Sequence, residues 1–203
     1  MNIVIATKNQ HKLNEIKRKF KQITNIHIQS INQYNIPDIE ETGTTFAENA
    51  MIKAKTVAAI TGEISLADDS GLVVDTLNGQ PGIKSARYGG PGLTDQDRNN
   101  LLLKQLTDIP DKERTAHFIC VIAIIDPHNN KTYLAEGICD GIITRQPQGL
   151  NGFGYDPVFW VAKFNKTMAE LPLEIKNSIS HRALALEKAL NILQTINQQK
   201  NGS

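Results

Sequence analysis

Short apolar runs typical of β-strands alternate in this sequence with segments whose apolar residues recur at helical spacing. Residues 2–6 form a continuous β-prone run, and Leu13, Ile16 and Phe20 then lie on one face of a predicted helix. Another strand is predicted at 26–30. Because strands and helices alternate in this way, the sequence predicts an α/β fold with a mixed sheet.

The strongest strand signals lie in the middle of the chain. Residues 115–125 and 133–139 are rich in β-branched and other apolar side chains, and the segment 126–130 between them is rich in turn-forming residues. We expect these two strands to pair antiparallel. A shorter strand, predicted at 65–67, leads directly into the acidic run 68–71.

Helix starts are marked by capping boxes, in which a threonine hydroxyl and an acidic residue three positions later satisfy each other's backbone N–H groups. They occur at three places: Thr45 with Glu48, Thr94 with Asp97, and Thr167 with Glu170. The first predicts an alanine-rich helix at 46–60 that ends at Gly62, and the second predicts a helix through Leu106. A final helix is predicted from Ser180, with a frayed tail at 198–203.

The composition is that of an ordinary globular protein, with 40% hydrophobic and 21% charged residues. A chain of 203 residues fits one domain or two closely packed lobes, and we predict a single domain over 1–203. The net charge of +1 and the 5% aromatic content indicate no basic stripe with interleaved aromatic residues, so no nucleic-acid partner is expected. Any affinity for phosphate must therefore arise from local placement of polar groups.

The apolar segments are too short to cross a membrane. The run 119–125 is far below the roughly 20 residues that a spanning helix needs, so no membrane partner is expected. Residues 1–6 have no basic leader and too short an apolar run for a signal peptide, which makes the cytoplasm the expected location. Cys120 and Cys139 lie in strand-like runs without ligand spacing, so both are expected to be buried and unbridged.

The first candidate site is the segment 7–12, between a strand end and a helix start. Free backbone N–H groups and the positive end of the helix dipole favour anions at such a place. Thr7 and Asn9 add side-chain donors, and Lys12 adds a positive charge. The segment lacks the glycines of a phosphate-binding loop, and polar residues at a helix start often serve only as caps. Both interpretations stay open from this motif alone.

The second candidate site is acidic. Asp68 and Asp69 follow the predicted strand at 65–67, and Glu40 and Glu41 lie on an upstream loop. Carboxylates can hold Mg²⁺, which prefers hard oxygen ligands, and one of them can deprotonate a water molecule. The alternative is that the run 68–71 is a turn in which the side chains cap the backbone.

Two isolated cations are candidate phosphate ligands. Lys53 lies five residues after Glu48 on the predicted helix 46–60, and Arg87 lies in the Gly- and Pro-rich loop 79–92. A solvated side chain is the more common role for residues of this kind.

The last candidate site is aromatic and lies toward the C-terminus. Phe153 stands between two glycines, an arrangement in which a ring can lie flat against a nucleobase. Asp156 can accept a hydrogen bond from a ring N–H, and His181 and Arg182 can donate to exocyclic oxygens. Alternatively, Phe153 is a core residue and the two cations only begin the last helix. The motifs together, unlike any one alone, describe a site for a nucleoside triphosphate.

These motifs resemble those of the non-canonical purine NTP pyrophosphatases, also called inosine triphosphate or XTP/dITP pyrophosphatases. The matching segments run in order through nearly the whole chain: Ala6 to Asn9 with Lys12, Glu41 to Gly43, Phe46 to Ala50 with Lys53 and Ala54, Ala67 to Leu72, Pro81 to Ile83, Ser85 to Tyr88, Gly152 to Pro157, and Ser180 to Arg182. So many motifs in one order make the resemblance specific. It implies an elongated mixed β-sheet with flanking helices, two lobes around a central substrate cleft, and a homodimer.

The resemblance also implies a reaction and a role for individual residues. Enzymes of this family hydrolyse ITP, dITP and XTP to the nucleoside monophosphate and pyrophosphate with Mg²⁺, which keeps deaminated purines out of DNA and RNA. Asp69 would be the catalytic proton acceptor, and Glu41 and Asp69 would hold Mg²⁺, with Glu40 as the alternative to Glu41. The implied substrate-binding residues are Thr7, Lys8, Asn9, Gln10, His11, Lys12 and Lys53 at the triphosphate, Ser70, and Phe153, Gly154, Tyr155, Asp156, Lys176, His181 and Arg182 at the base.

One position departs from the family pattern. The family often has a small residue after Thr7, where this chain has Lys8, which leaves the local phosphate contacts open.

Two other functions are alternatives to this one. The first is a pyrophosphatase of related fold that acts on pyrimidine or modified nucleotides, against which the segment 180–182 argues. A second is a non-catalytic nucleotide- or RNA-binding protein, against which the low aromatic content argues.

Overall fold

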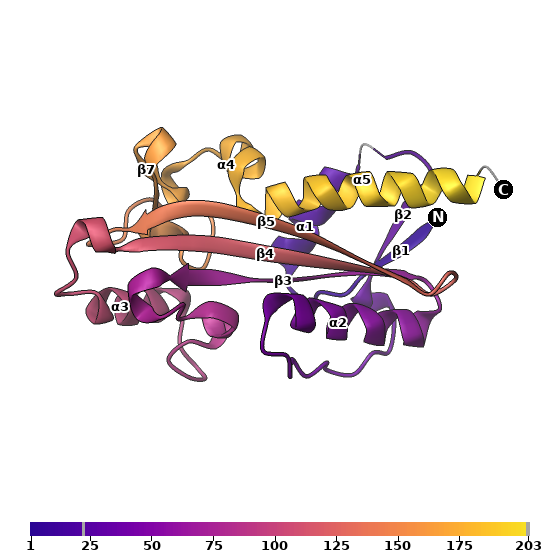
Figure 1. The fold of residues 1–203 in the computed structure, drawn as a ribbon, viewed down its shortest axis with the longest axis horizontal. Helices are drawn as coiled ribbons and strands as arrows, with labels where there is room; N and C mark the ends of the chain where they lie inside the picture. Colours follow the sequence, from indigo (N-terminus) through magenta and orange to yellow (C-terminus); the bar gives the residue numbers. More distant parts are fainter. Residues whose placement is uncertain (22, 202–203) are drawn as a thin grey trace. The chain divides into compact units, whose positions relative to one another are not determined.

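The computed structural model describes residues 1–21 and 23–201. The α-helices in this part of the chain are α1 (Gln10–Phe20), α2 (Phe46–Thr61), α3 (Asp95–Gln105), α4 (Leu173–Ile179) and α5 (His181–Asn201). The strands are β1 (Asn2–Ile5), β2 (His27–Ser30), β3 (Ile64–Val74), β4 (Thr115–Asp126), β5 (Lys131–Ile143), β6 (Phe159–Val161) and β7 (Lys166–Thr167) (Figure 1). The strands form one seven-stranded sheet in the order β2-β1-β3-β4-β5-β6-β7. Parallel pairs at β1 and antiparallel pairs at β6 make the sheet mixed, which confirms the predicted α/β class.

Contacts divide the chain into two compact units. Unit 1 comprises Met1–Asp69, Cys120–Gly137 and Arg182–Ser203, and unit 2 comprises Ser70–Ile119 and Ile138–His181. Strands β3, β4 and β5 therefore contribute residues to both units. Each unit has a hydrophobic core of its own.

The strands of unit 1 separate two layers of helices. Alternate residues of β1 face opposite sides of the sheet, so that Ile3 and Ile5 pack with α1 and α5 whereas Val4 packs with α2. Figure 1 shows α1 and α5 on one side of these strands and α2 on the other. Strand β1 runs parallel to β3 with Ile5 opposite Leu66. The loop that follows β1 consequently lies beside the residues that follow Leu66 in β3, at the carboxyl end of β1.

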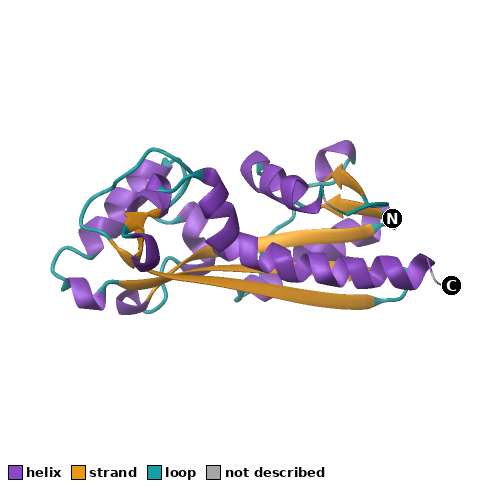
Figure 2. Cartoon of the chain, turned by 90° about the horizontal axis from the view of Figure 1, so that it is seen from above, coloured by secondary structure: helices purple, strands orange, loops and turns teal. Residues whose placement is uncertain are grey.

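Helix α5 packs along unit 1 through an apolar face that includes Leu186, Leu190 and Leu193. The N-terminus of the chain, which leads into β1, and the C-terminal end of this helix lie at the same end of the unit (Figure 2). The first turn of α5, which contains Arg182, thereby lies toward the carboxyl end of β1. The predicted frayed tail, 198–203, overlaps the end of α5, and residues 202 and 203 lie outside the described part of the chain.

Unit 2 is built around a second apolar cluster. Leu72 of β3, Leu102 of α3 and Phe159 of β6 are fully buried in it. The Arg114 side chain is 1% exposed, and its guanidinium donates from Nε to the Ile143 carbonyl oxygen at 2.8 Å. The same guanidinium donates to the carbonyl oxygens of Leu106 and Thr144, so it satisfies acceptors at the ends of α3 and β5.

Most predicted element boundaries are found within a few residues, and the caps are confirmed. Both helical capping boxes form: the Thr45 hydroxyl accepts from Glu48 N–H at 3.1 Å and the Thr94 hydroxyl accepts from Asp97 N–H at 3.2 Å. Gly62 ends α2 in the left-handed conformation. The box at Thr167 forms as well, but it begins only the short 3₁₀ turn Met168–Glu170. Both cysteines are free and buried, as predicted.

The strand predicted at 65–67 was too short, and the alternative of a turn at 68–71 is wrong. Strand β3 continues through the run Asp68 to Gly71 to Val74. Acidic residues are tolerated inside a buried strand here because cations and an amide from neighbouring helices contact them. Helix α4 and the 3₁₀ turn Gly82–Arg87 lie in segments where no helix was predicted. Both are short, and short helices depend on packing more than on local sequence.

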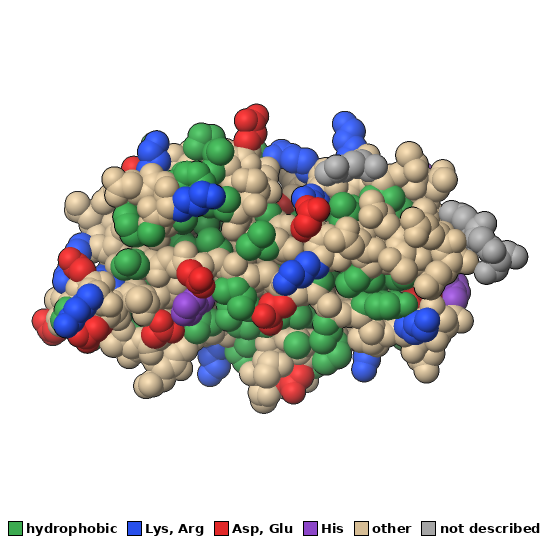
Figure 3. Space-filling view, turned by 45° about the horizontal axis from the view of Figure 1, so that its top comes forward, with side chains coloured by type: hydrophobic (Ala, Val, Ile, Leu, Met, Phe, Trp, Pro, Cys, Tyr) green, Lys and Arg blue, Asp and Glu red, His purple; other side chains and the backbone are tan. Residues whose placement is uncertain are grey.

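The described residues have no helix with both the length and the apolar composition that crossing a bilayer requires. On the face shown in Figure 3, Lys and Arg side chains are interspersed with Asp and Glu. This mixture agrees with the net charge of +1. It also agrees with the expectation that any phosphate site depends on a few nearby polar groups and not on the charge of the whole surface.

One ion-pair cluster in unit 2 predicts pH-dependent stability. His117 Nδ1 lies 2.8 Å from Asp140 Oδ1, and His117 Nε2 lies 3.3 Å from Asp75 Oδ1. The hydrogen bond to Asp140 and the charge of Asp75 raise the pKa of His117. A raised pKa means that the folded state holds the proton more tightly than the unfolded state, so the contribution is complete below about pH 6.5 and is lost as the pH rises further.

We therefore expect His117→Gln to lower the free energy of unfolding at pH 5.5 and to have a smaller effect at pH 8.5. Urea denaturation at the two pH values measures this difference. A destabilisation that is equal at both would mean that His117 is not held as an imidazolium between the two carboxylates.

Candidate active site

The segment 7–12 forms the start of α1, as predicted. Asn9 is the N-cap, and its Oδ1 accepts from the backbone N–H of His11 at 2.9 Å and of Lys12 at 3.3 Å. The Thr7 hydroxyl oxygen accepts from Asn9 N–H at 3.2 Å. The polar side chains of this segment thus shape a helix N-terminus, which carries partial positive charge. Lys8 extends from it to form an exposed ion pair with Asp38.

The remaining residues of the segment divide between solvent and interior. Gln10 is exposed and donates from Nε2 to Asn14 Oδ1 at 2.7 Å, and His11 is exposed as well. The side chain of Lys12 is 17% exposed and turns toward the sheet, where Nζ lies 2.9 Å from Asp68 Oδ2. Lys12 therefore links the helix start to strand β3.

Asp68 is the centre of a buried ion cluster in unit 1. Its side chain is 1% exposed, and its Oδ2 contacts both Lys12 Nζ and, at 3.3 Å, Arg182 Nε. Arg182 Nη1 in turn lies 2.8 Å from Glu15 Oε2. Burial by itself raises the pKa of Asp68, but the charges of Lys12, Arg182 and Lys53 outweigh it and hold that pKa well below its ordinary value. Asp68 is consequently ionised, and its carboxylate holds Lys12 and Arg182 in place.

Asp69 lies in a different environment, one residue further along β3. Its Oδ1 is 3.3 Å from Lys53 Nζ, and its Oδ2 accepts from Asn49 Nδ2 at 3.3 Å. The Glu41 Oε1 atom lies 2.7 Å from the same Lys53 Nζ. Two carboxylates thus converge on one cation. They lie beside the carboxyl end of β1, where α1 begins. Glu40 is exposed, so the structure places Glu41 and not Glu40 in this group.

The electrostatics of the group favour a proton acceptor and a charged lysine. Burial raises the pKa of Asp69, the nearby Glu41 carboxylate acts in the same direction, and Lys53 opposes both. Burial alone would lower the pKa of Lys53, but the charges of Asp69 and Asp68 raise it, so the ammonium is retained. A carboxylate whose pKa is moved toward neutrality is a better general base than an ordinary one.

The aromatic segment lies in unit 2 and is held by a second buried ion pair. Asp156 Oδ2 accepts from Lys176 Nζ at 2.5 Å and from Phe153 N–H at 2.9 Å. Lys176 Nζ also lies 4.7 Å from the centre of the Phe153 ring, a cation–π distance. The side chains of Lys176 and Asp156 are 7% and 5% exposed. One carboxylate therefore fixes both the loop backbone and the cation beneath the ring.

Other predicted residues of unit 2 take structural positions around this loop. The Tyr155 hydroxyl donates to the Ser85 carbonyl oxygen at 2.9 Å, so its polar end is anchored in the core. The His181 ring stacks on Phe118 with the centroids 4.7 Å apart. Ser70 follows Asp69 in β3 and is half-buried, whereas Arg87 ends a 3₁₀ turn and is exposed.

Two residues of the site were not predicted from the sequence. Asn49 is fully buried on α2 and bridges Asp69 to the acidic loop, because its Oδ1 accepts from Gly43 N–H at 2.8 Å. An asparagine on the apolar face of an alanine-rich helix is a recognisable signal for such a role. Glu15 carries no comparable signal, since a glutamate on α1 looks like any exposed helix residue until its contact with Arg182 is known.

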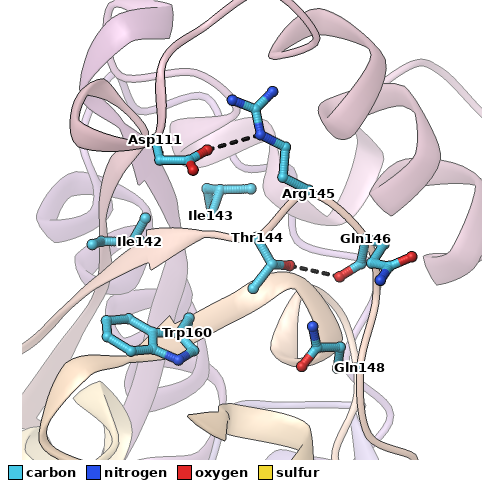
Figure 4. A pocket seen from close by; sticks show the side chains of 8 residues that line it. All are labelled: Asp111, Ile142, Ile143, Thr144, Arg145, Gln146, Gln148 and Trp160. Carbon is cyan, nitrogen blue, oxygen red and sulfur yellow. Dashed lines mark hydrogen bonds and ion pairs between the residues drawn. The ribbon is translucent and has the colours of Figure 1, made fainter. Parts of the chain in front are cut away.

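A cavity of about 410 Å³ opens elsewhere in unit 2 (Figure 4). It is lined by Asp111, Ile142, Ile143, Thr144, Arg145, Gln146, Gln148 and Trp160, none of which belongs to a predicted site. Arg145 bonds Asp111 from Nε at 2.8 Å and the Thr107 carbonyl oxygen from Nη1 at 3.0 Å. These contacts direct the charge of the Arg145 guanidinium at the protein itself and not at a ligand.

The two glycines that flank Phe153 are expected to differ in how much their replacement by alanine destabilises the protein. A Cβ on Gly152 would lie 2.0 Å from Asp156 Oδ2 and 3.1 Å from Lys176 Nζ, and Gly152 also has φ of +81°. Gly154 has φ of +62° but open space around its Cβ position. We expect Gly154→Ala to cost about 1 kcal/mol of strain alone and Gly152→Ala at least about 2 kcal/mol more, because it also disrupts the ion pair. Urea denaturation measures both, and equal destabilisation would contradict the packing at Gly152.

This chain is similar to known proteins along nearly its whole length. The sequence model of the Ham1 family matches residues 3–192. The dITP/XTP pyrophosphatase of Desulforamulus reducens is 47% identical over 197 residues, which cover 97% of each chain. The dITP/XTP pyrophosphatase of Listeria innocua is 48% identical over 187 residues, which cover 92% of this chain and 91% of the relative.

Solved structures show the same relationship. A HAM1 protein from Coxiella burnetii superposes with a TM-score of 0.90 at 43% identity, covering 96% of this chain and 99% of the other. The Staphylococcus aureus Ham1 protein superposes with a TM-score of 0.88 at 41% identity over the same shares. The family resemblance inferred from the motifs is thereby confirmed, and this chain belongs to the Ham1 family.

Proposed function

We propose that this chain is a Mg²⁺-dependent pyrophosphatase that hydrolyses the aberrant purine nucleotides dITP, XTP and ITP to the nucleoside monophosphate and pyrophosphate. The names of its relatives support the reaction. The observation that carries the proposal is the position of the Asp69 carboxylate. It shares Lys53 with Glu41 beside the carboxyl end of β1, where α1 begins. Such activity would keep deaminated purines out of DNA and RNA.

The triphosphate is the part of the substrate that unit 1 is suited to bind. The N-terminus of α1, capped by Asn9, offers backbone N–H groups and a favourable dipole. Lys12 and Lys53 add two ammonium groups, each already oriented by a carboxylate. These fixed charges would stabilise the negative charge that develops on the leaving pyrophosphate.

The carboxylates fit a Mg²⁺ ion bound together with its substrate. Glu41 and Asp69 would hold it, because their oxygens already converge on a cation, the Lys53 ammonium. Among the described residues, no three His, Cys, Asp or Glu side chains form a complete metal site by themselves. Mg²⁺ commonly binds through one or two carboxylates plus substrate phosphates and water. When bound, it would supply charge neutralisation at the phosphate oxygens.

Asp69 is the proposed general base. It would accept a proton from a water molecule whose oxygen forms a bond to the α-phosphorus. The bond between that phosphorus and the oxygen bridging to the β-phosphorus breaks, and pyrophosphate leaves. Asn49 would hold the Asp69 carboxylate in orientation through its amide donor. Most of the rate enhancement would come from positioning and electrostatics.

Unit 2 supplies the proposed base contacts. Phe153 would stack on the purine, with Lys176 fixing the ring from below. His181 would donate to the 6-keto oxygen of hypoxanthine or xanthine. A 6-amino group in the same place leaves this donor without an acceptor, which disfavours ATP.

The proposal is tested by pyrophosphate release from dITP, XTP, ITP, ATP and dUTP, each with Mg²⁺ and with EDTA. We expect rapid release from the first three, slow release from ATP and dUTP, and none with EDTA. Faster hydrolysis of dUTP would favour the pyrimidine alternative, and tight binding without pyrophosphate release would favour a non-catalytic binding protein. The proposed homodimer is tested separately by sedimentation equilibrium of the same preparation.

A further inference from the structure

Helix α3 begins with side chains that no part of the proposed reaction uses. Its capping box is closed on both sides, since Asp97 Oδ2 accepts from Thr94 N–H at 2.9 Å and the Thr94 hydroxyl accepts from Asp97 N–H. A helix start fixed in this way holds the first turn rigidly. Asp95 follows the cap directly, and Asn99 lies four residues later on the same face.

These two residues bind the two peptide groups that flank Gly154 in the aromatic loop. The Gly154 N–H donates to Asp95 Oδ2 at 2.8 Å, and Asn99 Nδ2 donates to the Gly154 carbonyl oxygen at 3.0 Å. Gly154 is thus bound through its backbone donor and its backbone acceptor. Its φ of +62° is in the left-handed region that glycine adopts without a steric penalty.

The burial of Asn99 indicates a specific role for its side-chain amide. The residue is 3% exposed, and within the described residues its Oδ1 is buried without a hydrogen-bond partner. An apolar side chain of similar size would fill this space without that unsatisfied oxygen. The amide is therefore explained by what its donor does, which is to bind Gly154.

The loop has a second fixed point on the other side of the aromatic ring. Phe153 N–H is held by Asp156, whereas the next residue, Gly154, is held by α3. The backbone on both sides of the Phe153 ring is consequently anchored to rigid parts of unit 2. Removal of the α3 contacts would release one of these anchors and let the ring change its position.

We propose that Asp95 and Asn99 are positioning residues for base selection, which fix the backbone on both sides of Gly154 so that the Phe153 ring is presented in one orientation to a purine. This inference rests on the proposed function, because it assigns α3 a part in the specificity of that site. Neither residue touches the proposed phosphate and metal group, whose members all lie in unit 1.

The test compares Asp95→Ala and Asn99→Ala with matched controls on the same helix. Asn100→Ala removes an exposed amide next to Asn99, and Asp95→Asn keeps an oxygen that can accept from Gly154 N–H. For each variant, kcat and KM are measured with ITP and with ATP. Hydrogen exchange of the Gly154 amide is measured by NMR in the absence of nucleotide.

We expect both alanine variants to raise KM for ITP and to lower the ratio of kcat/KM for ITP over ATP by about tenfold or more, with little change in kcat. Exchange at Gly154 should be faster in Asp95→Ala than in wild type. Asn100→Ala and Asp95→Asn should stay within about twofold of wild type in both measurements.

Equal losses toward ITP and ATP, or slow exchange at Gly154 in Asp95→Ala, would overturn the inference. If Asn99→Ala does not fold, Asp95→Ala still decides the matter, because the Asp95 side chain is 57% exposed and its removal leaves no cavity. If wild-type protein does not hydrolyse ITP, the proposed function fails, and the role in base selection is rejected with it. Hydrogen exchange would still report separately whether α3 holds the loop.

Discussion

Replacing Asp69 with asparagine is expected to lower pyrophosphate release from dITP by about 10²- to 10⁴-fold, because general-base catalysis contributes an effect of that size. Asparagine has nearly the same shape as aspartate but cannot accept the proton from water. Its oxygen can still accept from the Asn49 amide, so the fold of unit 1 should be retained. Steady-state kinetics with dITP and Mg²⁺ measure the effect, and circular dichroism checks the fold.

Glu136→Gln is the matched control for Asp69→Asn. Glu136 is an exposed carboxylate on β5 in the same unit, and its neutralisation changes the net charge by the same amount. We expect this control to keep wild-type rates. Near-normal turnover of Asp69→Asn would show that another group accepts the proton, and a loss in both variants would point to net charge instead of the position of the carboxylate.

Replacing Asp68 with alanine is expected to destabilise the protein by about 3–5 kcal/mol, the usual cost of removing one partner from a buried ion pair. The Arg182 side chain is 3% exposed and that of Lys12 17% exposed, so both cations would lose the Asp68 carboxylate together, although Arg182 keeps its contact with Glu15. Urea denaturation followed by the fluorescence of Trp160, the one tryptophan in the sequence, measures the change.

Asp68→Ala is best compared with Glu136→Ala, an exposed position where about 0.5 kcal/mol or less is expected. An Asp68→Ala protein as stable as this control would mean that water reaches and solvates the two cations. The comparison also separates the two neighbouring aspartates. Asp68 should dominate stability and Asp69 should dominate turnover, although they stand side by side in β3.

Local sequence patterns were enough to predict much of the fold and part of the site. The alternation of strand and helix periods indicated the α/β class, and the cap at Thr45 and the glycine at Gly62 marked the ends of α2. The β-prone run 2–6 and the helical spacing of Leu13, Ile16 and Phe20 placed the segment 7–12 correctly at the start of α1. These features depend on interactions within a few residues, which the sequence displays directly.

The environment of the two aspartates could not be predicted in the same way. The run Asp68 to Gly71 has the composition of a turn, yet it is strand, because Lys12 and Arg182 compensate the buried charge of Asp68. The Arg182 contact joins residues 114 positions apart. No local pattern encodes a partner at that distance, since the pair forms only when α5 packs on the sheet.

The order of the elements, their caps and the family could thus be inferred without coordinates, because hydrophobic period, capping chemistry and motif order are written along the chain. Three other properties required the folded molecule: that Glu41 and not Glu40 joins Lys53, that Asp68 organises cations while Asp69 carries the raised pKa, and that α3 binds the backbone of Gly154. Burial and long-range electrostatics set these properties. Both depend on which side chains the packed elements bring together.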